Sequence, residues 1–434
     1  MGLPSIPTDF KIKAIFRLII FAFILFTFTL LVKIYNFDTN KPFNQNKIFN
    51  VKLNPAPFCR TTLRLKFNEH LEGNGKYDYL RFDTPIYGIE SDDVLLIDEI
   101  KNKASGDPVL NKGKKKYFIA MNLFNNEEII ANYIQELVLL IKFLGAENVF
   151  LSIYENGSVD KTPEILREFK SFLRPLDVRF NIKTEKNSRP SVYHRIAYLA
   201  QIRNKALEPL KDEESKGYKY DKIIFMNDIT FCRNDILELL YQSDLQKADF
   251  TVPIDIRSEG EPRFLAYRDS WVGRDLNGDV IIGGLVDLIK HQVSAERYNQ
   301  FLPFQVQCGW NGVAVLNAKP FYGKNALRFR RSKVGTDECA ASECSILCND
   351  FWERGFRRII TVPKILVGYR IENISLIDSN IQKILDTNVT LPEKIPYGNG
   401  PNQIWCLGLA GNNNHHPDVP GVWKNYIEGD KTVS

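Results

Sequence analysis

Two polar residues, Asn227 and Asp228, follow directly after the short apolar run 223–226. Such a run is typical of a strand that is buried on both faces of a parallel sheet. A carboxylate at the carboxyl end of such a strand lies where open α/β sheets bind their ligands. There it can hold a hard divalent cation beside a diphosphate. The alternative is that both residues only turn the chain toward a helix after Cys232.

The elements that would position this carboxylate alternate regularly from Tyr117 onward. We predict strands at 117–121, 149–153, 178–182 and 223–226, and helices from a cap at Asn125–Asn126 to Leu144, at 162–173 and at 191–207. This alternation predicts an α/β fold, a mostly parallel sheet with helices on both faces. After Pro253 the pattern loosens, and it returns at a strand, 313–316, and a helix, 344–353.

Loops at the carboxyl ends of these strands should meet at one edge of the sheet. These loops should bring Glu155 close to Asp228. One interpretation is that Glu155 accepts hydrogen bonds from a guanine edge, and the alternative is that it is an exposed acid before a turn. Arg203 would contact a phosphate, unless it is an ordinary surface residue of its helix. The glycine patterns of dinucleotide-binding folds, P-loops and GxSxG hydrolases are absent, which argues against those classes.

The N-terminal region predicts a membrane anchor. Residues 14–33 are long and apolar enough to span a bilayer, and basic residues precede them, so we predict a cytoplasmic tail at 1–13 and a lumenal remainder. A cleaved signal peptide is the alternative, but no small-x-small cleavage site follows Val32. We assign 34–115 to a stem and N-terminal packing segment, and 116–427 to the lumenal domain.

Composition supports a secretory-pathway setting and no nucleic-acid partner. The net charge of the 434 residues is only +5, with Lys and Arg scattered along the chain. All seven cysteines follow the anchor, no CxxC pair suggests zinc, and the odd count leaves at least one thiol outside an internal disulfide. Sequons for N-glycosylation lie at Asn156, Asn373 and Asn388.

Six ordered motifs resemble a known family. They are residues 150–162 (FLSIYENGSVDKT), 200–206 (AQIRNKA), 225–231 (FMNDITF), 269–271 (DSW), 307–312 (QCGWNG) and 342–345 (SECS). The chain from about 117 to 370 is similar to the fungal cryptococcal α-1,3-mannosyltransferases, glycosyltransferase family 69, which also includes capsule-associated proteins. The resemblance implies a GT-A type, Rossmann-like nucleotide-sugar fold, GDP-mannose as donor, Mn²⁺ or Mg²⁺ as cofactor, and a Golgi-type lumenal location.

The site residues that we expect follow from these motifs. Asp228 is the metal ligand and, with Glu343, a catalytic candidate; Glu343 is otherwise a first-turn helix acid. Donor-binding candidates are Glu155, Arg203, Asn204, Asn227 and Asp228. Acceptor-binding candidates are Trp310, Asn311 and Asp269, although Trp310 could equally be a core residue.

One departure from the GT-A pattern affects the metal. Many GT-A enzymes carry Asp-x-Asp after the central strand, whereas this chain has Asn227-Asp228-Ile229. Further ligands would come from the diphosphate or from His415 and His416 in the tail, which are otherwise residues of an exposed polar loop. The family resemblance leads us to expect a mannosyltransferase that acts on a mannose-containing glycan and forms an α-1,3 linkage with retention of configuration. The alternative is a non-catalytic relative that assists polysaccharide synthesis or export.

Overall fold

The computed structural model describes residues 55–81, 115–188, 190, 193–260, 263–371, 374–409 and 420–427. Several predicted features lie outside these residues: the anchor at 14–33, the sequon at Asn373, and the tail histidines His415 and His416. Within the described ranges, no helix combines the length and apolarity that crossing a bilayer requires.

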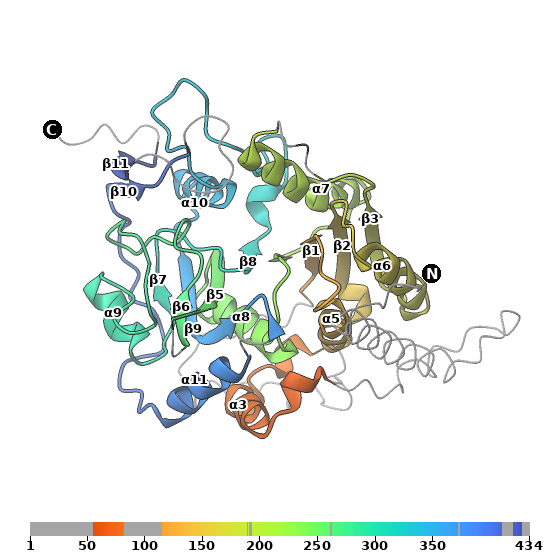
Figure 1. Cartoon of the computed structure of the whole chain (residues 1–434), viewed down its shortest axis with the longest axis horizontal. Helices are drawn as coiled ribbons and strands as arrows, with labels where there is room; N and C mark the ends of the chain where they lie inside the picture. The colour runs from red at the N-terminus through yellow and green to blue at the C-terminus, as the bar shows by residue number, and fades with distance from the viewer. Residues whose placement is uncertain are drawn as a thin grey trace, which may run out of the picture. The chain divides into compact units, whose positions relative to one another are not determined.

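Four parallel strands form one half of the central sheet, in the order β3-β2-β1-β4 (Figure 1). They are β1 (Tyr117–Leu123), β2 (Val149–Glu155), β3 (Arg179–Thr184) and β4 (Lys222–Met226), which confirms the four predicted strands. The strand order reverses direction at β1, since β2 lies on one side of it and β4 on the other. The gap between the carboxyl ends of β1 and β4 is therefore the topological switch point, where open α/β sheets bind ligands.

The other half of the sheet is mixed. β8 (Val313–Asn317) runs antiparallel between β4 and β5 (Phe250–Glu259). On the other side of β5, β9 (Ile359–Val367) is parallel to it, and β7 (Phe304–Gln305) pairs with β9. β6 (Phe264–Tyr267) pairs with the end of β5. The loosened pattern after Pro253 suggested that regular structure ends there. This interpretation is wrong, because β5 continues through the proline. The register with β9 shifts between Val252 and Ile254, and such an irregularity is where a strand tolerates a residue without an N–H.

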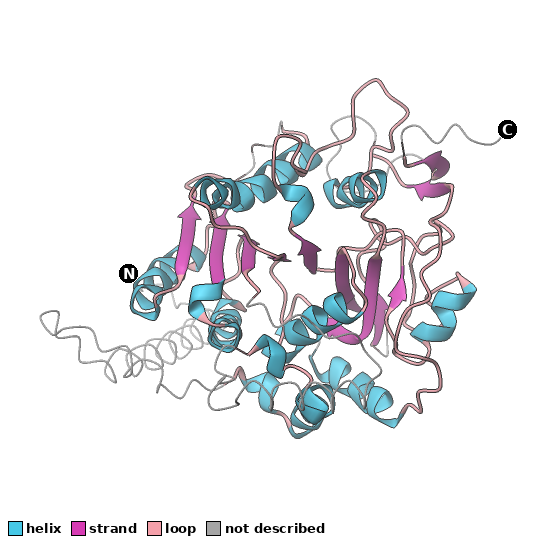
Figure 2. Ribbon diagram, turned by 180° about the vertical axis from the view of Figure 1, so that it is seen from behind, coloured by secondary structure: helices cyan, strands magenta, loops and turns pink. Residues whose placement is uncertain are grey.

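Helices cover both faces of the sheet. They are α5 (Ile130–Leu144), α6 (Thr162–Leu173), α7 (Arg195–Ser215), α8 (Arg233–Leu245), α9 (Gln292–Tyr298), α10 (Glu343–Glu353) and α11 (Ile374–Asp386). α7 and α10 lie on one side of the strands and α5 and α8 on the other (Figures 1 and 2). α5 begins later than predicted, because the side chain of Asn126 accepts a hydrogen bond from the N–H of Phe124 at 2.7 Å and does not cap the helix.

Residues before the sheet also belong to the packed domain. α3 (Thr62–Glu72) lies beside α8 and α11, within the range 34–115 that we assigned to a stem and N-terminal packing segment. A disulfide joins Cys59 to Cys232, and the buried Arg64 and Asp235 form an ion pair at 2.8 Å. These two long-range links place an otherwise polar segment against the core.

Shorter elements complete the described chain. β10 (Gln403–Cys406) and β11 (Val422–Asn425) form a separate antiparallel hairpin. Short 3-10 turns occupy Pro57–Arg60, Gly73–Gly75, Asp78–Leu80, Ala146–Asn148, Arg174–Leu176 and Lys319–Phe321. Further disulfides join Cys308 to Cys348 and Cys339 to Cys406, and Cys344 is the remaining cysteine, a buried free thiol.

Candidate active site at the carboxyl edge of the sheet

Asp228 lies at the switch point, two residues after the end of β4. Its side chain is half-buried, and its Oδ2 accepts a hydrogen bond from Nδ2 of Asn126, in the loop after β1, at 3.3 Å. The other carboxylate oxygen makes no hydrogen bond to a described residue. This oxygen is therefore available to a cation or to a ligand in the gap between β1 and β4.

The neighbouring Asn227 is fixed at three points. Its backbone N–H donates to the carbonyl of Gly312 at 2.8 Å, and its carbonyl accepts from the hydroxyl of Tyr133 at 3.1 Å. Its side-chain Oδ1 accepts from Nη1 of Arg203 at 2.9 Å. Asn227 therefore sets the direction of the chain that presents Asp228, and its side-chain oxygen is already bound within the protein.

Arg203 and Glu343 form a buried ion pair beside Asn227. Nε of Arg203 lies 2.8 Å from Oε1 of Glu343, the first residue of α10, and the guanidinium lies 4.6 Å from the ring centre of Trp310. Burial alone would lower the pKa of Arg203, but the nearby Cys344 and Glu343 outweigh it and raise the pKa. Arg203 is thus no ordinary surface residue, and Nη2 is its one nitrogen without a hydrogen bond to a described residue.

The geometry changes the role that we expected for Glu343. Its side chain is only 1% exposed, Oε1 is held by Arg203, and Oε2 accepts from the hydroxyl of Ser342 at 3.2 Å. A carboxylate enclosed in this way cannot reach an acceptor hydroxyl. Glu343 therefore fixes Arg203 and through it Asn227, and we assign it a positioning role.

The side chains of three other predicted binding residues make their contacts within the protein. Trp310 is 2% exposed and packs edge-on against Phe225 and other aromatic rings, so the core interpretation holds. The side chain of Asn311 donates to the carbonyl of Pro253 at 2.5 Å and accepts from the hydroxyl of Tyr267 at 2.6 Å. The amide of Asn204 binds the backbone N–H and C=O of Phe329. These three side chains support the site but do not face a ligand.

A pair of carboxyl groups lies on the same side of the site: Asp255 in the second half of β5 and Asp269 in the loop after β6. Oδ1 of Asp255 accepts from the backbone N–H of Asp269 at 3.1 Å, and Oδ2 accepts from the hydroxyl of Tyr369 at 3.4 Å. Burial and then the charge of Asp269 raise the pKa of Asp255 well above its ordinary value. Burial raises the pKa of Asp269 to about 6, although a hydrogen bond from the N–H of Asn311 partly opposes this rise. The pair therefore holds a proton near neutral pH.

Sequence analysis missed two tyrosines that face these carboxylates. Burial raises the pKa of Tyr133, and the charge of Asp228 raises it further. Burial and then Asp255 raise the pKa of Tyr369, whose ring carries the guanidinium of Arg268 at 3.4 Å from its centre. Both tyrosines stay protonated and can donate hydrogen bonds. In the sequence they are ordinary aromatic residues, and no motif marks them.

Glu155 lies at the end of β2 and is fully buried, so it is not the exposed acid of the alternative interpretation. Oε1 accepts from the backbone N–H of Ser158 at 2.5 Å, which closes the turn after the strand. Oε2 is buried without a hydrogen-bond partner among the described residues. A buried acceptor of this kind is uncommon in proteins, but the turn encloses it, and guanine could reach it only if the turn opened.

The residues present fit a divalent cation that is held mainly by its ligand. In the described ranges, no group of three or more His, Cys, Asp or Glu side chains could hold a metal ion. Asp228 nevertheless offers one free carboxylate oxygen, the ligand type that Mg²⁺ and Mn²⁺ prefer. Mg²⁺ commonly binds through one or two carboxylates together with substrate phosphates, and this site allows that arrangement.

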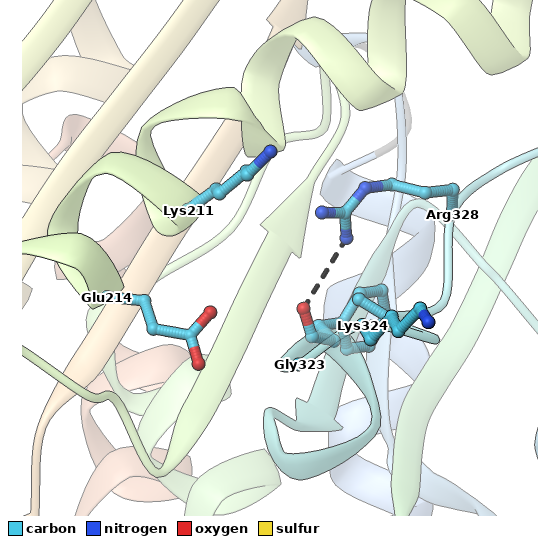
Figure 3. Close-up of a pocket in the computed structure, with 7 residues that line it drawn as sticks. Lys211, Glu214, Gly323, Lys324 and Arg328 are labelled. Atoms are coloured by element: carbon cyan, nitrogen blue, oxygen red, sulfur yellow. Dashed lines mark hydrogen bonds between the residues drawn. The ribbon is translucent and has the colours of Figure 1, made fainter.

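An open pocket of about 480 Å³ lies elsewhere, at the C-terminal part of α7 (Figure 3). Its labelled lining residues are Lys211, Glu214, Gly323, Lys324 and Arg328, and Arg328 donates to the carbonyl of Phe321 at 3.4 Å. Lys211 is eight residues beyond Arg203 on the same helix, or about 12 Å along the axis. This pocket therefore does not contain the carboxylate-bearing strand ends.

Sequence comparison assigns the chain to a family. The model of the family described as Cryptococcal mannosyltransferase 1 matches residues 116–350, more than half of the chain, so the chain belongs to this family. One relative is "Alpha-1,3-mannosyltransferase CMT1" of Cryptococcus neoformans var. neoformans serotype D. It is 31% identical over 282 residues, which are 60% of this chain and 59% of that protein. The chain thus spans less than two thirds of this relative.

Solved structures resemble the chain only distantly. The mannosyltransferase PcManGT from Pyrobaculum calidifontis, solved with GDP-Man and Mn²⁺, is 10% identical with a TM-score of 0.36, and the match covers 70% of this chain and 67% of that one. S. aureus TarS 1–349 is 11% identical with a TM-score of 0.31, over 64% of this chain and 67% of that one. At these scores we infer nothing from them about ligands.

Proposed function

We propose that this protein transfers mannose from GDP-mannose to a hydroxyl of a mannose-containing glycan, forming an α-1,3 linkage with retention of configuration. Family membership and the 31% identity to an α-1,3-mannosyltransferase support the proposal. The structural observation that carries it is the free oxygen of Asp228 at the switch point of the sheet. A carboxylate at such a place can bind the cation that accompanies the diphosphate of a sugar nucleotide.

On the donor side, the chain's own residues hold charge in a fixed geometry. Asp228 would bind Mn²⁺ or Mg²⁺, which when bound neutralises the charge of the departing diphosphate. Arg203, clamped by Glu343, holds Asn227 and hence the backbone that presents Asp228, and its Nη2 can donate to a phosphate oxygen. Such preorganised groups stabilise charge in a transition state without reorganising.

On the acceptor side, Asp269 is the carboxyl group best placed to meet a sugar hydroxyl. Unlike Asp255, which is 1% exposed, its side chain is partly open to solvent. The ionised form of Asp269 can accept a hydrogen bond from the acceptor hydroxyl and so orient it toward the donor. Asp255 accepts hydrogen bonds from the backbone N–H of Asp269 and from the hydroxyl of Tyr369, which fixes the position of Asp269.

A non-catalytic role in polysaccharide synthesis or export is the second candidate. The observation that favours it is the single carboxylate after β4, where Asn227 stands in place of a first Asp and is already bound by Arg203. Such a protein could retain nucleotide-sugar binding or lose it, but it would transfer no sugar.

A transfer assay separates the two functions. Purified full-length protein is incubated with GDP-mannose, MnCl₂ and an α-mannoside acceptor, and the product linkage and anomeric configuration are determined by NMR. We expect an α-1,3-linked product that disappears on chelation with EDTA and returns when manganese is added in excess. GDP-mannose binding without transfer or hydrolysis, across a panel of mannosides, would favour the non-catalytic role.

We also propose a single-pass type II membrane protein with its catalytic domain in the lumen of the Golgi or another secretory compartment. The apolar segment 14–33 with basic residues before it supports this orientation. The disulfides Cys59–Cys232, Cys308–Cys348 and Cys339–Cys406 fit an oxidising compartment. In sealed microsomes the bulk of the chain should resist added protease, and its digestion without detergent would contradict the orientation.

A further inference from the structure

The hairpin β10–β11 carries two tryptophans and two amides on one of its faces. Side chains alternate between the faces of a strand, and the register pairs Trp405 with Trp423 and Gln403 with Asn425. The two indole rings lie 5.5 Å apart at 74°, and Nε2 of Gln403 donates to Oδ1 of Asn425 at 3.1 Å. Trp423 is 45% exposed, a large fraction for an indole. We call these four residues the hairpin face.

The opposite side of the hairpin attaches it to the domain. Ile404 and Cys406 are each 4% exposed, and Cys406 forms the disulfide with Cys339 in the segment before α10. Lys424, also on this side, makes an ion pair with Asp337 at 2.9 Å. Figure 1 shows β10 and β11 beside α10. The tryptophans are therefore held outward on a fixed support.

The hairpin is continuous with the loop that carries Asp269. The indole Nε1 of Trp271, two residues after Asp269, donates to the carbonyl of Leu407 at 2.7 Å. Nε of Arg274 donates to the carbonyl of Trp405 at 2.7 Å. Hydrogen bonds thus tie the loop on the acceptor side of the proposed active site directly to the hairpin segment.

The chemistry of the hairpin face matches a neutral sugar chain. Indole rings bury apolar area and have no charge, which suits the C–H face of a pyranose ring. The amides of Gln403 and Asn425 can exchange their mutual hydrogen bond for bonds to sugar hydroxyls. The charged residue of β11, Lys424, belongs to the opposite face and is paired, so the face offers nothing specific to an anionic glycan.

We propose that the hairpin face is a distal subsite that binds neutral pyranose residues of the acceptor glycan, away from the residue that receives the new sugar. This inference rests on the proposed function for the identity of the glycan as an acceptor, but the binding itself does not require transfer. It assigns the acceptor to a class, chains of several sugars, and gives Trp423 the main stacking role.

The test compares short and long acceptors in full-length protein. Binding of mannose and of linear α-linked mannooligosaccharides of increasing length is measured by calorimetry without donor, and KM and kcat are measured with GDP-mannose and manganese. We expect Trp423→Ala to weaken binding of the longest oligosaccharide and raise its KM about tenfold, since tryptophan dominates binding where it is an anchor. The kcat and the KM of the short acceptor should not change.

Matched variants separate stacking from folding. Lys424→Ala removes a side chain from the opposite face of the same strand and should behave as wild type, whereas Trp423→Phe should recover part of the lost affinity. Length-independent KM in wild type, or equal binding by wild type and Trp423→Ala, would overturn the proposal. If oligosaccharides bind through Trp423 but no sugar is transferred, the subsite stands and the proposed catalytic function fails.

Discussion

Two carboxylate regions at the same edge of the sheet differ in what surrounds them. After the end of β4, Asp228 is half-buried, and one of its carboxylate oxygens has no hydrogen-bond partner among the described residues. In the second half of β5, Asp255 is enclosed by Asp269, Tyr369 and the neighbouring strand β6. The first region offers a carboxylate oxygen that a cation can bind, whereas burial raises the pKa values of the two carboxyl groups in the second region. The role of a carboxylate therefore depends on the residues that surround it, and not only on its position at the edge of the sheet.

Arg203 connects the two regions, so its removal should have the largest effect. Its guanidinium binds Asn227 and Glu343, and its charge also lowers the pKa of Asp269. Arg203→Met leaves the carboxylate of Glu343 buried and unpaired, and loss of one partner from a buried pair costs about 3–5 kcal/mol. Chemical denaturation should show this loss in the free energy of unfolding.

The double variant Arg203→Met/Glu343→Leu is the control. Because it removes both charges, it should recover much of the stability that the single variant loses. A single variant within about 1 kcal/mol of wild type, which is the range of exposed ion pairs, would show that the two regions are not joined through this pair.

Asp228→Asn tests the open region alone. The fold should remain, because the side chain lies beyond the packed strand, but the charge on the cation-binding oxygen is lost. Losing one well-placed electrostatic contact costs about 3 kcal/mol, or on the order of a hundredfold in rate. We expect nearly wild-type thermal unfolding, transfer slower by about that factor, and GDP binding that manganese no longer strengthens.

Asn227→Asp provides the matched substitution one residue away. It restores an acidic first position, and its carboxylate can accept the same hydrogen bond from Arg203, so transfer should be unchanged or mildly reduced. Near-normal transfer by Asp228→Asn at saturating manganese and donor would remove the assigned role of Asp228.

Asp269→Asn tests the proton-holding region through pH. Because the folded-state pKa of Asp269 is raised to about 6, its protonated form stabilises the fold below the ordinary carboxyl pKa, and this stability is lost as pH rises through 6. The loss should be on the order of 3 kcal/mol. In Asp269→Asn this pH dependence of unfolding should be reduced. Wild-type transfer should rise with pH near 6, as Asp269 ionises, and the variant should lack this rise. Identical pH profiles of wild type and variant would contradict the assignment.

The smallest expected effect concerns the turn after β2. The side chain of Asn156 is only 8% exposed, next to the buried Glu155, whereas Asn388 is exposed. Glycosylation requires an accessible side chain, so we predict that Asn388 carries a glycan and Asn156 does not. Glycopeptide mapping of active protein checks this, and substantial occupancy at Asn156 would mean that the turn is open and that Glu155 can meet a ligand.

The sequence by itself determined the alternating half of the fold. Each strand and helix from Tyr117 to Met226 has its own hydrophobic period, so local patterns sufficed to locate these elements. The same reasoning located Asp228 at a strand end, and the motifs identified the family. The hydrophobic pattern did not predict β5, because Pro253 suggests a loop. Only the register shift with β9 shows how the strand accommodates this proline.

Only the tertiary structure decided which polar residues are open and which are enclosed. Arg203 and Glu343 lie 140 residues apart, and nothing in either segment shows that they form a buried pair. Asp255 and Tyr369, 114 residues apart, likewise meet only because β5 and β9 are neighbours in the sheet. Burial and hydrogen bonding set the charge state of such groups, and both depend on contacts between segments that are distant in the chain.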